Sequence, residues 1–346
     1  MNILVIYNLK RKNFFKGIPR DFYSEFDSYK TVKAIADALR ERGHRVRLKE
    51  ANGQLLSYLI DQKREIDFVF NIAEGINGYP SRESQVPAIL DFLEIPYTGS
   101  NVLTLAISLD KFYTKKLCIV ENIPTPKFQF FPTEKEKIDS SLRFPLIVKP
   151  NAEGSAKGIT KDSVVYNKQK LREQINRVIR DYKQPALVEE FIEGKEITVG
   201  ILGNDSPVVF PLLEIDFSSC RGSGEFFYSW RMKEFQGDRT KHLTPTFYCP
   251  ARIEEKVAKK ISELALKAYR AIGCFDFSRI DFRLDRENNP YFLEINPLPG
   301  LDPIESNFPL MARTAGISYK ELVNKILEVA LKRVNGRFKK GGRLVE

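Results

Sequence analysis

The sequence has few of the residues that build disulfide frameworks, zinc sites or catalytic triads. Its four cysteines are scattered widely over 346 residues, and no CxxC pair occurs. This usage fits a reducing compartment and argues against a disulfide framework or a cysteine-based zinc site. With only two histidines, His44 and His242, we expect neither a Ser-His-Asp triad nor a His-rich metal centre.

Long apolar runs and targeting signals are also missing. The N-terminal "MNILVIYN" is apolar but only about a strand long, and it has neither a basic leader nor a small-residue cleavage site. No apolar run approaches the length that a membrane-spanning helix requires. We therefore expect a cytoplasmic protein with no membrane partner.

The net charge of +10 is spread along the chain. The one dense basic cluster is the tail "KRVNGRFKKGGR", which we expect to be mobile. No RNA-binding or helix-turn-helix signature occurs. The basic surface is therefore expected to serve anionic small molecules, and no nucleic acid is expected as a partner.

The length suggests two or three domains. Strand and helix patterns alternate over the first hundred residues, which predicts an open, mostly parallel α/β sheet. Strands are expected at "ILVIY", "RVRLKE" and "IDFVFN". Helices are expected at "TVKAIADALRERGH" and at the start of "RESQVPAILDFLEIPYTG".

A helical stretch, "NVLTLAISLDKFYTKKLCIVEN", leads into the second region. Strands are predicted there at "IPTPKFQFF", "FPLIVKP", "PALVEEFIEG", "KEITVGILG" and "PVVFPLLEI". The stretch from Asp216 to Thr246 has little periodicity, as functional lids and disordered segments do. A helix at "EEKVAKKISELALKAYRAIG", a hairpin of "SRIDFRL" with "YFLEIN", and a closing helix at "YKELVNKILEVALKRVNG" follow.

The run "YFLEINPLPGL" places a carboxylate and an amide two residues apart at the end of a strand. Residues i and i+2 of a strand share a face, so Glu294 and Asn296 should project together while Leu293 and Ile295 pack behind them. Two solvated polar residues on an outer face would give the same pattern.

Pairing with "SRIDFRL" would add Asp281 to that face, with Arg279 beside it. Three oxygen ligands, two of them anionic, suit Mg²⁺. A structural salt-bridge network explains the same residues equally well.

Two further stretches suit a nucleotide. The loop "KPNAEGSAKGI" follows an apolar run, and its small residues would let backbone amides approach an anion, with Lys149 just before it. It is neither a Walker A loop nor a dinucleotide fingerprint. The strand "ALVEEFIEGKEITV" carries Glu189, Glu190 and Glu196 among apolar residues, which suits either adenine and ribose contacts or an exposed acidic edge.

Together these motifs resemble the ATP-grasp superfamily, and more closely the D-alanine–D-alanine ligase family. The resemblance rests on "IPYTGS", "SLDK", "IVKP..EGS..GI", "YCPA", "RIDF" and "LEIN..PG". It covers the chain from about Asp67 to the closing helix.

The resemblance implies a set of residues around ATP. Lys111 and Lys149 would meet the phosphates, covered by a flexible glycine loop. Glu189 would meet adenine, and Glu196 ribose. The full nucleotide set is Lys111, Lys149, Glu153, Gly154, Ser155, Gly158, Glu189, Phe191, Ile192, Glu196 and Phe282.

It also implies the metal and catalytic residues. Two Mg²⁺ ions, or Mn²⁺ as an alternative, would be held by Asp281, Glu294 and Asn296. Lys233 would be a lid lysine that reaches the phosphates, and Ser155 would orient the substrate. The reacting carboxylate would be stabilised by Arg279 and by the backbone N–H of Gly300.

The chain departs from the family on the substrate side. In place of the N-terminal glycine-rich segment stands "RDFYSEFDSYKTV", where Glu25 or Asp27 would substitute. The family's His-Gly segment is replaced by "NIAEGINGYPSRES", and the tyrosine after the lid lysine by Glu234. The serine that grips the acceptor is replaced by Glu305, with Ser306 beside it.

We therefore expect an α/β and α+β fold of three domains. They comprise an N-terminal open parallel sheet at residues 1–101, a small central α+β subdomain with the glycine loop at 102–193, and a C-terminal antiparallel-sheet domain at 194–346. The last would hold the Mg²⁺ hairpin and the basic tail.

The resemblance implies a ligase that forms a peptide bond between amino acids through an acyl phosphate, in cell wall biogenesis. Small amino-acid or peptide substrates are expected and, by analogy, a homodimer. Two alternatives stay open. One is an ATP-grasp ligase for another amino acid or for a peptide or protein acceptor. The other is a non-enzymatic protein that binds nucleotides or nucleic acids.

Overall fold

Three β-sheets organise the chain in the computed structural model, which describes residues 1–11, 19–76, 78–235 and 243–340. The N-terminal sheet is parallel, in the order β2-β1-β3, which confirms the predicted α/β start. Its strands are β1 (Asn2–Tyr7), β2 (Arg45–Glu50) and β3 (Phe68–Asn71). Its helices are α1 (Tyr29–Glu41), α2 (Leu55–Gln62) and α3 (Gln85–Phe92).

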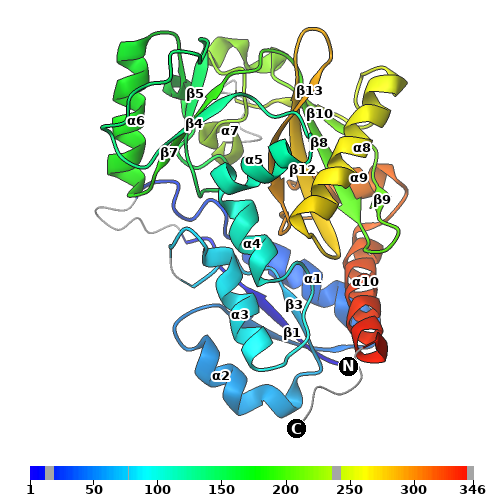
Figure 1. The fold of residues 1–346 in the computed structure, drawn as a ribbon. Helices are drawn as coiled ribbons and strands as arrows, with labels where there is room; N and C mark the ends of the chain where they lie inside the picture. The colour runs from blue at the N-terminus through cyan, green and yellow to red at the C-terminus, as the bar shows by residue number, and fades with distance from the viewer. Residues whose placement is uncertain (12–18, 77, 236–242, 341–346) are drawn as a thin grey trace.

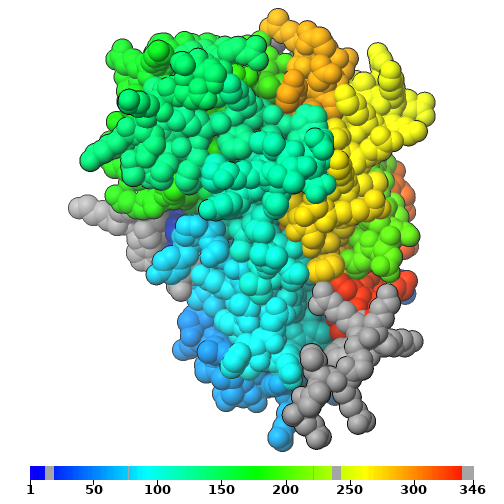
Figure 2. Space-filling model, viewed as in Figure 1, coloured from blue at the N-terminus to red at the C-terminus, as the bar shows by residue number. Residues whose placement is uncertain are grey.

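The helical stretch that leaves this sheet is two helices rather than one. Helix α4 (Val102–Leu109) ends at Asp110, and α5 (Lys111–Val120) begins there. The Asp110 carboxylate accepts a hydrogen bond from the backbone N–H of Tyr113 at 3.0 Å, so Asp110 caps the second helix. This break places Lys111 in the first turn of α5. In the space-filling view, these helices fill the face between the central sheet (green) and α8 (yellow) (Figure 2).

The central sheet is antiparallel, in the order β4-β7-β5-β6. Its strands are β4 (Phe128–Phe131), β5 (Leu146–Pro150), β6 (Val164–Val165) and β7 (Ala186–Glu190). Helix α6 (Lys168–Tyr182), which was not predicted from the sequence, packs Leu171, Ile175 and Val178 against the sheet residues Leu146, Val148 and Val188 (Figure 1).

The C-terminal sheet has the order β11-β10-β8-β12-β13, with β9 beside β8. Its strands are β8 (Glu196–Leu202), β9 (Val208–Val209), β10 (Leu213–Asp216), β11 (Thr246–Tyr248), β12 (Phe277–Leu284) and β13 (Pro290–Asn296). The run predicted as one strand at "PVVFPLLEI" is thus split into β9 and β10. The predicted hairpin is confirmed, because Asp281 pairs with Glu294 and Arg279 with Asn296.

Four further helices accompany this sheet. They are α7 (Trp230–Glu234), α8 (Glu255–Ile272), α9 (Asn307–Thr314) and α10 (Tyr319–Lys340). Helix α10 shares a core with α1, in which Val32, Ile35 and Leu39 lie with Leu322 and Ile326. The C-terminal helix therefore packs onto the N-terminal region (Figure 1), and the three-domain division remains a prediction.

Helix α10 continues through most of "KRVNGRFKKGGR" to Lys340, and residues 341–346 lie outside the described part of the chain. The expected mobility of this tail remains a prediction. Across the described ranges, no helix is both long and apolar enough to cross a membrane.

Candidate active site

A cavity of about 580 Å³ lies where the three sheets meet. Its walls come from the loop after β5, from β8 and the β12–β13 hairpin, and from the loop before α1. Most of the residues singled out from the sequence line it. Gly154 and Asn296 line a smaller adjoining cavity instead, and Gly158 and Phe282 line neither. The larger cavity is the candidate active site.

Alternation along β12 selects the residues that face this cavity. Arg279, Asp281 and Arg283 line it. The intervening Ile280 and Phe282 belong to the apolar core behind the sheet. Phe282 was expected on the nucleotide side. It is instead buried away from the cavity, because successive residues of a strand point to opposite faces and Phe282 follows the cavity-lining Asp281.

A β-bulge changes the opposite strand. Asp281 pairs with Glu294, but the next residue, Phe282, pairs with Phe292, so Leu293 is an extra residue on β13. The bulge turns both Leu293 and Glu294 toward the cavity. The expectation that Leu293 packs behind the sheet is thus wrong, whereas Ile295 does lie in the core.

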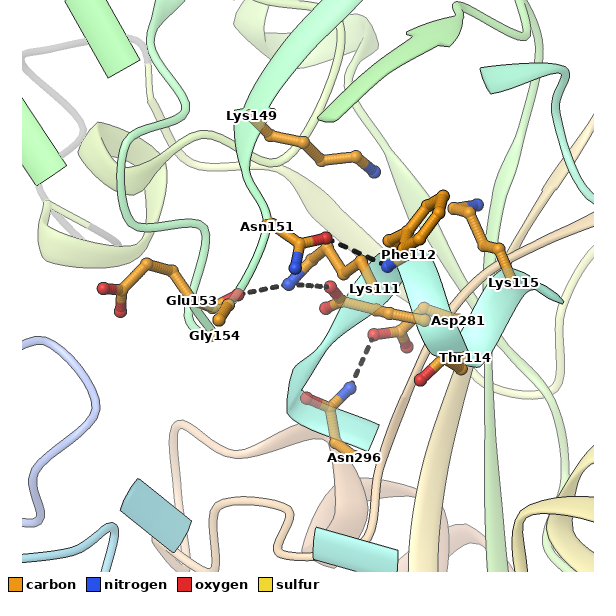
Figure 3. A network of polar contacts seen from close by, with 12 residues as sticks. Lys111, Phe112, Thr114, Lys115, Lys149, Asn151, Glu153, Gly154, Asp281 and Asn296 are labelled. Atoms are coloured by element: carbon orange, nitrogen blue, oxygen red, sulfur yellow. Dashed lines mark hydrogen bonds and ion pairs between the residues drawn. The ribbon is translucent and has the colours of Figure 1, made fainter. Parts of the chain in front are cut away.

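The proposed metal ligands converge at one edge of the cavity. Asn296 donates to Asp281 at 3.3 Å, as Figure 3 shows. Asp281 also accepts from the Thr198 hydroxyl at 2.8 Å and from the Arg279 guanidinium at 2.9 Å. The sequence left two explanations for Asp281 open, a metal ligand and a structural salt bridge. The carboxylate does form a salt bridge, with Arg279, and it also lies among the proposed metal ligands.

Glu294 stands in a strongly positive environment. Its carboxylate lies 3.4 Å from the Lys111 ammonium, which also donates to the carbonyl oxygen of Glu153 (Figure 3). Burial alone would raise the pKa of Glu294, but the charges of Lys111, Lys149 and Arg279 lower it to about 2. Glu294 is therefore ionised at neutral pH.

A second lysine cluster surrounds Glu189, which is 1% exposed. Its carboxylate lies 2.8 Å from the Lys149 ammonium and 3.1 Å from that of Lys115. Burial opposes ionisation, but the two ammonium groups lower the pKa of Glu189 below its ordinary value. Glu189 thus fixes Lys149 at the cavity wall while lining the cavity itself.

Apolar side chains also line the cavity, namely Ile147, Ile192, Ile215, Phe227 and Leu293. Ile147 pairs with Glu189 across β5 and β7. Such a lining, with a few polar groups at its edges, suits a flat heterocyclic ring.

A polar pair borders the apolar part of the cavity. Glu196 pairs with Arg283 at 3.2 Å, and burial raises the pKa of Glu196 to about 7. The Arg283 guanidinium also lies 4.7 Å from the centre of the Phe191 ring, so it supports this wall by a cation–π contact.

The glycine loop has an unusual backbone. Ser155 and Ala156 both have positive φ, 51° and 56°. Gly158 has a φ of +76°, and a Cβ there would lie 2.4 Å from the Cγ of Pro150, so only glycine fits. Non-glycine residues in the left-handed region cost free energy, which the contacts of the loop must offset.

Glu25 supplies much of that compensation. It accepts hydrogen bonds from the Gly154 backbone N–H at 2.7 Å and from Arg82 at 2.6 Å, and its other oxygen lies 3.3 Å from the Lys157 ammonium. Burial opposes its charge, yet Arg82 and Lys157 lower the pKa of Glu25 to about 2. Glu25 therefore ties the N-terminal loop to the glycine loop.

The segment expected to form a lid closes over the same place. The Trp230 indole donates to the Ser24 hydroxyl at 2.7 Å, and its backbone N–H donates to the Ile159 carbonyl at 3.1 Å. Lys10 pairs with Glu234 at 2.8 Å. Helix α7 thus contacts both loops, and residues 236–242 of the expected lid lie outside the described residues.

Two further residues of the cavity wall have shifted pKa values. They are Lys233, the expected lid lysine, and Asp27, an expected substrate-side residue. Burial, with the nearby Arg279 charge, lowers the pKa of Lys233 to about 8. Burial and the charge of Asp302 raise the pKa of Asp27 to about 7.

The loop after β13 completes the site. Gly300, Glu305 and Ser306 line the cavity. The Ser306 hydroxyl accepts from the Asp302 backbone N–H at 3.0 Å, and a Cβ on Gly300 would lie 2.9 Å from that hydroxyl. A larger residue at position 300 would therefore displace the Ser306 hydroxyl from this hydrogen bond.

Four charged residues that position the site were not assigned from the sequence. Lys157 lies in the glycine loop "KPNAEGSAKGI", and Arg283 lies in the strand "SRIDFRL". Because Arg283 is two residues after Asp281, the alternation of the strand places it on the same face. Arg82 and Lys115 act through partners far away in the chain, which spacing alone does not reveal.

Comparisons with known proteins agree on one family. Residues 120–328 match the family model described as D-ala D-ala ligase C-terminus. The chain is 38% identical over 313 residues to a D-alanine–D-alanine ligase of Carboxydothermus hydrogenoformans, covering 88% of this chain and 93% of that one. It is 37% identical over 309 residues to an uncharacterized protein of Sinorhizobium fredii, covering 88% of each chain. A solved D-alanine–D-alanine ligase from Bacillus anthracis is 25% identical with a TM-score of 0.74, covering 99% of this chain and 100% of that one.

Proposed function

Because this chain belongs to the D-alanine–D-alanine ligase family, we propose that it is an ATP-dependent carboxylate–amine ligase. The observation that carries the proposal is one cavity wall on which Asp281 and Glu294 stand beside Lys111 and Arg279. Two carboxylates that can bind Mg²⁺, placed beside the positive charges of a lysine and an arginine, suit the transfer of a phosphoryl group.

The nucleotide would occupy the end of the cavity near the central sheet. Its adenine would lie against the apolar lining, with Glu189 near its amino group and the backbone of Phe191 and Ile192 beside it. Glu196 would accept from the ribose hydroxyls. Lys149, with Lys111 and the amides of the glycine loop, would bind the phosphates.

The donor set fits magnesium. Asp281, Glu294 and Asn296 offer carboxylate and amide oxygens, which Mg²⁺ prefers, and Glu294 is held ionised. The described residues contain no group of three or more His, Cys, Asp or Glu side chains that would bind a metal, so phosphate oxygens and water would complete two such sites. Bound Mg²⁺, or Mn²⁺ in its place, would spread the negative charge of the phosphates.

The proposed reaction has two steps. A substrate carboxylate oxygen bonds to the γ-phosphorus of ATP, and ADP leaves, with Lys111 and Lys233 offsetting the charge. The amine of the second substrate then bonds to the acyl carbon, and phosphate leaves with that carboxylate oxygen and accepts a proton. Arg279 and the Gly300 N–H would stabilise the oxyanion between these events.

Closure would protect the acyl phosphate from water. The contacts of Glu25 with Gly154, and of Trp230 with Ser24 and Ile159, already join the loops that cover the cavity. Ser155, at the tip of the glycine loop, would help to orient the substrate.

We propose D-alanine as the substrate because several relatives at 31–38% identity are named D-alanine–D-alanine ligases. Glu305 and Ser306 would then face the acceptor. The proposal includes a role in cell wall precursor synthesis, a cytoplasmic location that the unpaired cysteines suit, and a homodimer by family analogy.

The test is ADP release from Mg²⁺-ATP with D-alanine, with the product mass read in parallel. A dipeptide mass that depends on both ATP and D-alanine supports the proposal. If a screen of D- and L-amino acids, hydroxy acids and short peptides gives turnover only with another pair, the reaction class stands and the D-alanine assignment falls. No ATP turnover with any substrate would overturn the proposal.

A further inference from the structure

Lys115 is a buried lysine that the proposed mechanism does not use. It lies on α5 (Figure 3), its side chain is fully buried, and it lines neither the main nor the smaller cavity. Its ammonium lies 3.1 Å from the Glu189 carboxylate and donates to the Thr125 hydroxyl at 2.7 Å and to the Phe292 carbonyl oxygen at 3.3 Å. Lys115 is therefore a fixed neighbour of Glu189 that a ligand in the cavity does not reach.

Lys149 is the second lysine beside Glu189, and its surroundings are different. Its ammonium lies 2.8 Å from the Glu189 carboxylate, which is its one ion-pair partner among the described residues. Unlike Lys115, Lys149 lines the main cavity. Its charge also acts at the proposed metal end of the site, because Lys111 and Lys149 together lower the pKa of Glu294 against the effect of burial. Lys149 thus stands between the carboxylate expected at adenine and the residues expected at the phosphates.

Phosphate binding by Lys149 would change the charge balance around Glu189. The flexible stem of a lysine lets its ammonium move from one anion to another within reach. Glu189 is only 1% exposed, and a buried carboxylate that loses its partner is costly. Burial lowers the pKa of Lys115 to about 8, although the charge of Glu189 opposes this, so Lys115 is still mostly charged at neutral pH. It can therefore keep Glu189 paired after Lys149 leaves.

We propose that Lys149 exchanges Glu189 for phosphate oxygens when ATP binds, and that Lys115 is the positioning residue that makes this exchange possible. This inference rests on the proposed ligase function. Lys115 does not touch the nucleotide. It holds the Glu189 carboxylate in place at the adenine end while Lys149 serves the phosphates. A ligand without phosphates, such as adenosine, leaves Lys149 on Glu189 and needs no help from Lys115.

The expected effects separate this role from simple support of Glu189. Lys115→Gln, which can still donate to Thr125, and Lys115→Met should each weaken ATP binding roughly tenfold or more, because Glu189 is left unpaired once Lys149 leaves it. Binding of adenosine should stay at the wild-type value. In a Glu189→Gln background no buried carboxylate needs a partner, so the same substitutions at Lys115 should leave ATP binding unchanged.

The experiment measures binding rather than turnover. A non-hydrolysable ATP analogue with Mg²⁺ is titrated calorimetrically into wild type, into both Lys115 variants, and into Glu189→Gln with and without Lys115→Gln. The affinity for adenosine is read from its competition with the analogue in the same proteins. The controls are Lys116→Gln, which alters an exposed lysine on the same helix, and Glu287→Gln, which alters an exposed glutamate on the β12–β13 turn. Far-UV circular dichroism checks that each variant is folded.

Loss of analogue binding by roughly tenfold or more in the Lys115 variants, with adenosine unaffected and no loss in the Glu189→Gln background, supports the inference. Equal losses for the analogue and for adenosine would reduce Lys115 to a support of Glu189 and overturn it. Unchanged analogue binding in the Lys115 variants, a loss that persists with Glu189→Gln, or no competition by adenosine in wild type would also overturn it. Wild type that binds the analogue but turns over no substrate would instead contradict the proposed function, and wild type that does not bind the analogue would overturn both.

Discussion

Glu25→Gln tests the link between the N-terminal loop and the glycine loop. The substitution keeps the shape of the side chain but removes the charge that faces Arg82 and Lys157. In the folded protein the pKa of Glu25 is lowered to about 2 from an ordinary 4.5. A difference of that size corresponds to about 3 kcal/mol, and breaking a buried ion pair costs about 3–5 kcal/mol.

The pH dependence has a defined sign. Because the pKa of Glu25 is lower in the folded state, its contribution to stability is complete above about pH 4.5. It is lost as the pH falls from there toward 2. The variant should therefore be less stable than wild type by about 3 kcal/mol at pH 7, and the difference should shrink as the pH falls below 4.5.

Urea denaturation at pH 7 measures this difference. The chain has one tryptophan, Trp230, and its indole donates to Ser24 in the same loop as Glu25, so its fluorescence reports on the closed loops directly. Far-UV circular dichroism follows the rest of the fold. A variant with the same midpoint as wild type and as Glu287→Gln would refute the assignment of Glu25 as the anchor.

Three further predictions concern the proposed nucleotide and metal residues. Glu294→Gln should abolish ADP formation with a wild-type far-UV circular dichroism spectrum, although loss of a charge that Lys111 and Lys149 favour should lower the melting temperature. Near wild-type turnover would contradict its metal role. Lys149→Ala should weaken ATP binding in calorimetric titration roughly tenfold to hundredfold, whereas unchanged affinity would exclude a phosphate contact. Lys233 has its pKa lowered to about 8, so kcat/KM for ATP should fall as the pH rises through 8 and this charge is lost. Lys233→Arg should move that fall to higher pH, and identical pH profiles would argue against the lid role.

The parts of the fold that depend on local patterns were predictable from the sequence. The parallel N-terminal sheet and the β12–β13 hairpin follow from apolar runs, alternation and turn residues. The face that carries Arg279, Asp281 and Glu294 follows from the period of two in a strand. What alternation does not give is the bulge at Leu293, because an extra residue depends on how the partner strand pairs.

The parts that depend on distant contacts were not predictable. Glu25 was expected on the substrate side, and it does line the cavity, but its contacts with Arg82 and Gly154, 57 and 129 positions away in the chain, could not be read from spacing. Glu74 and Glu83 likewise matched no spacing rule, although they line the smaller cavity. Helix α10 crosses to α1 for the same reason, since its apolar face does not specify which surface covers it.

The central claim is that the enzyme activates a carboxylate by phosphorylation, and oxygen transfer tests it most directly. The donor amino acid is supplied with ¹⁸O in its carboxylate, and the phosphate released during turnover is analysed by mass spectrometry. Formation of an acyl phosphate, followed by amine attack, predicts one ¹⁸O atom transferred to each phosphate that leaves. Turnover that releases phosphate without the label would contradict the account.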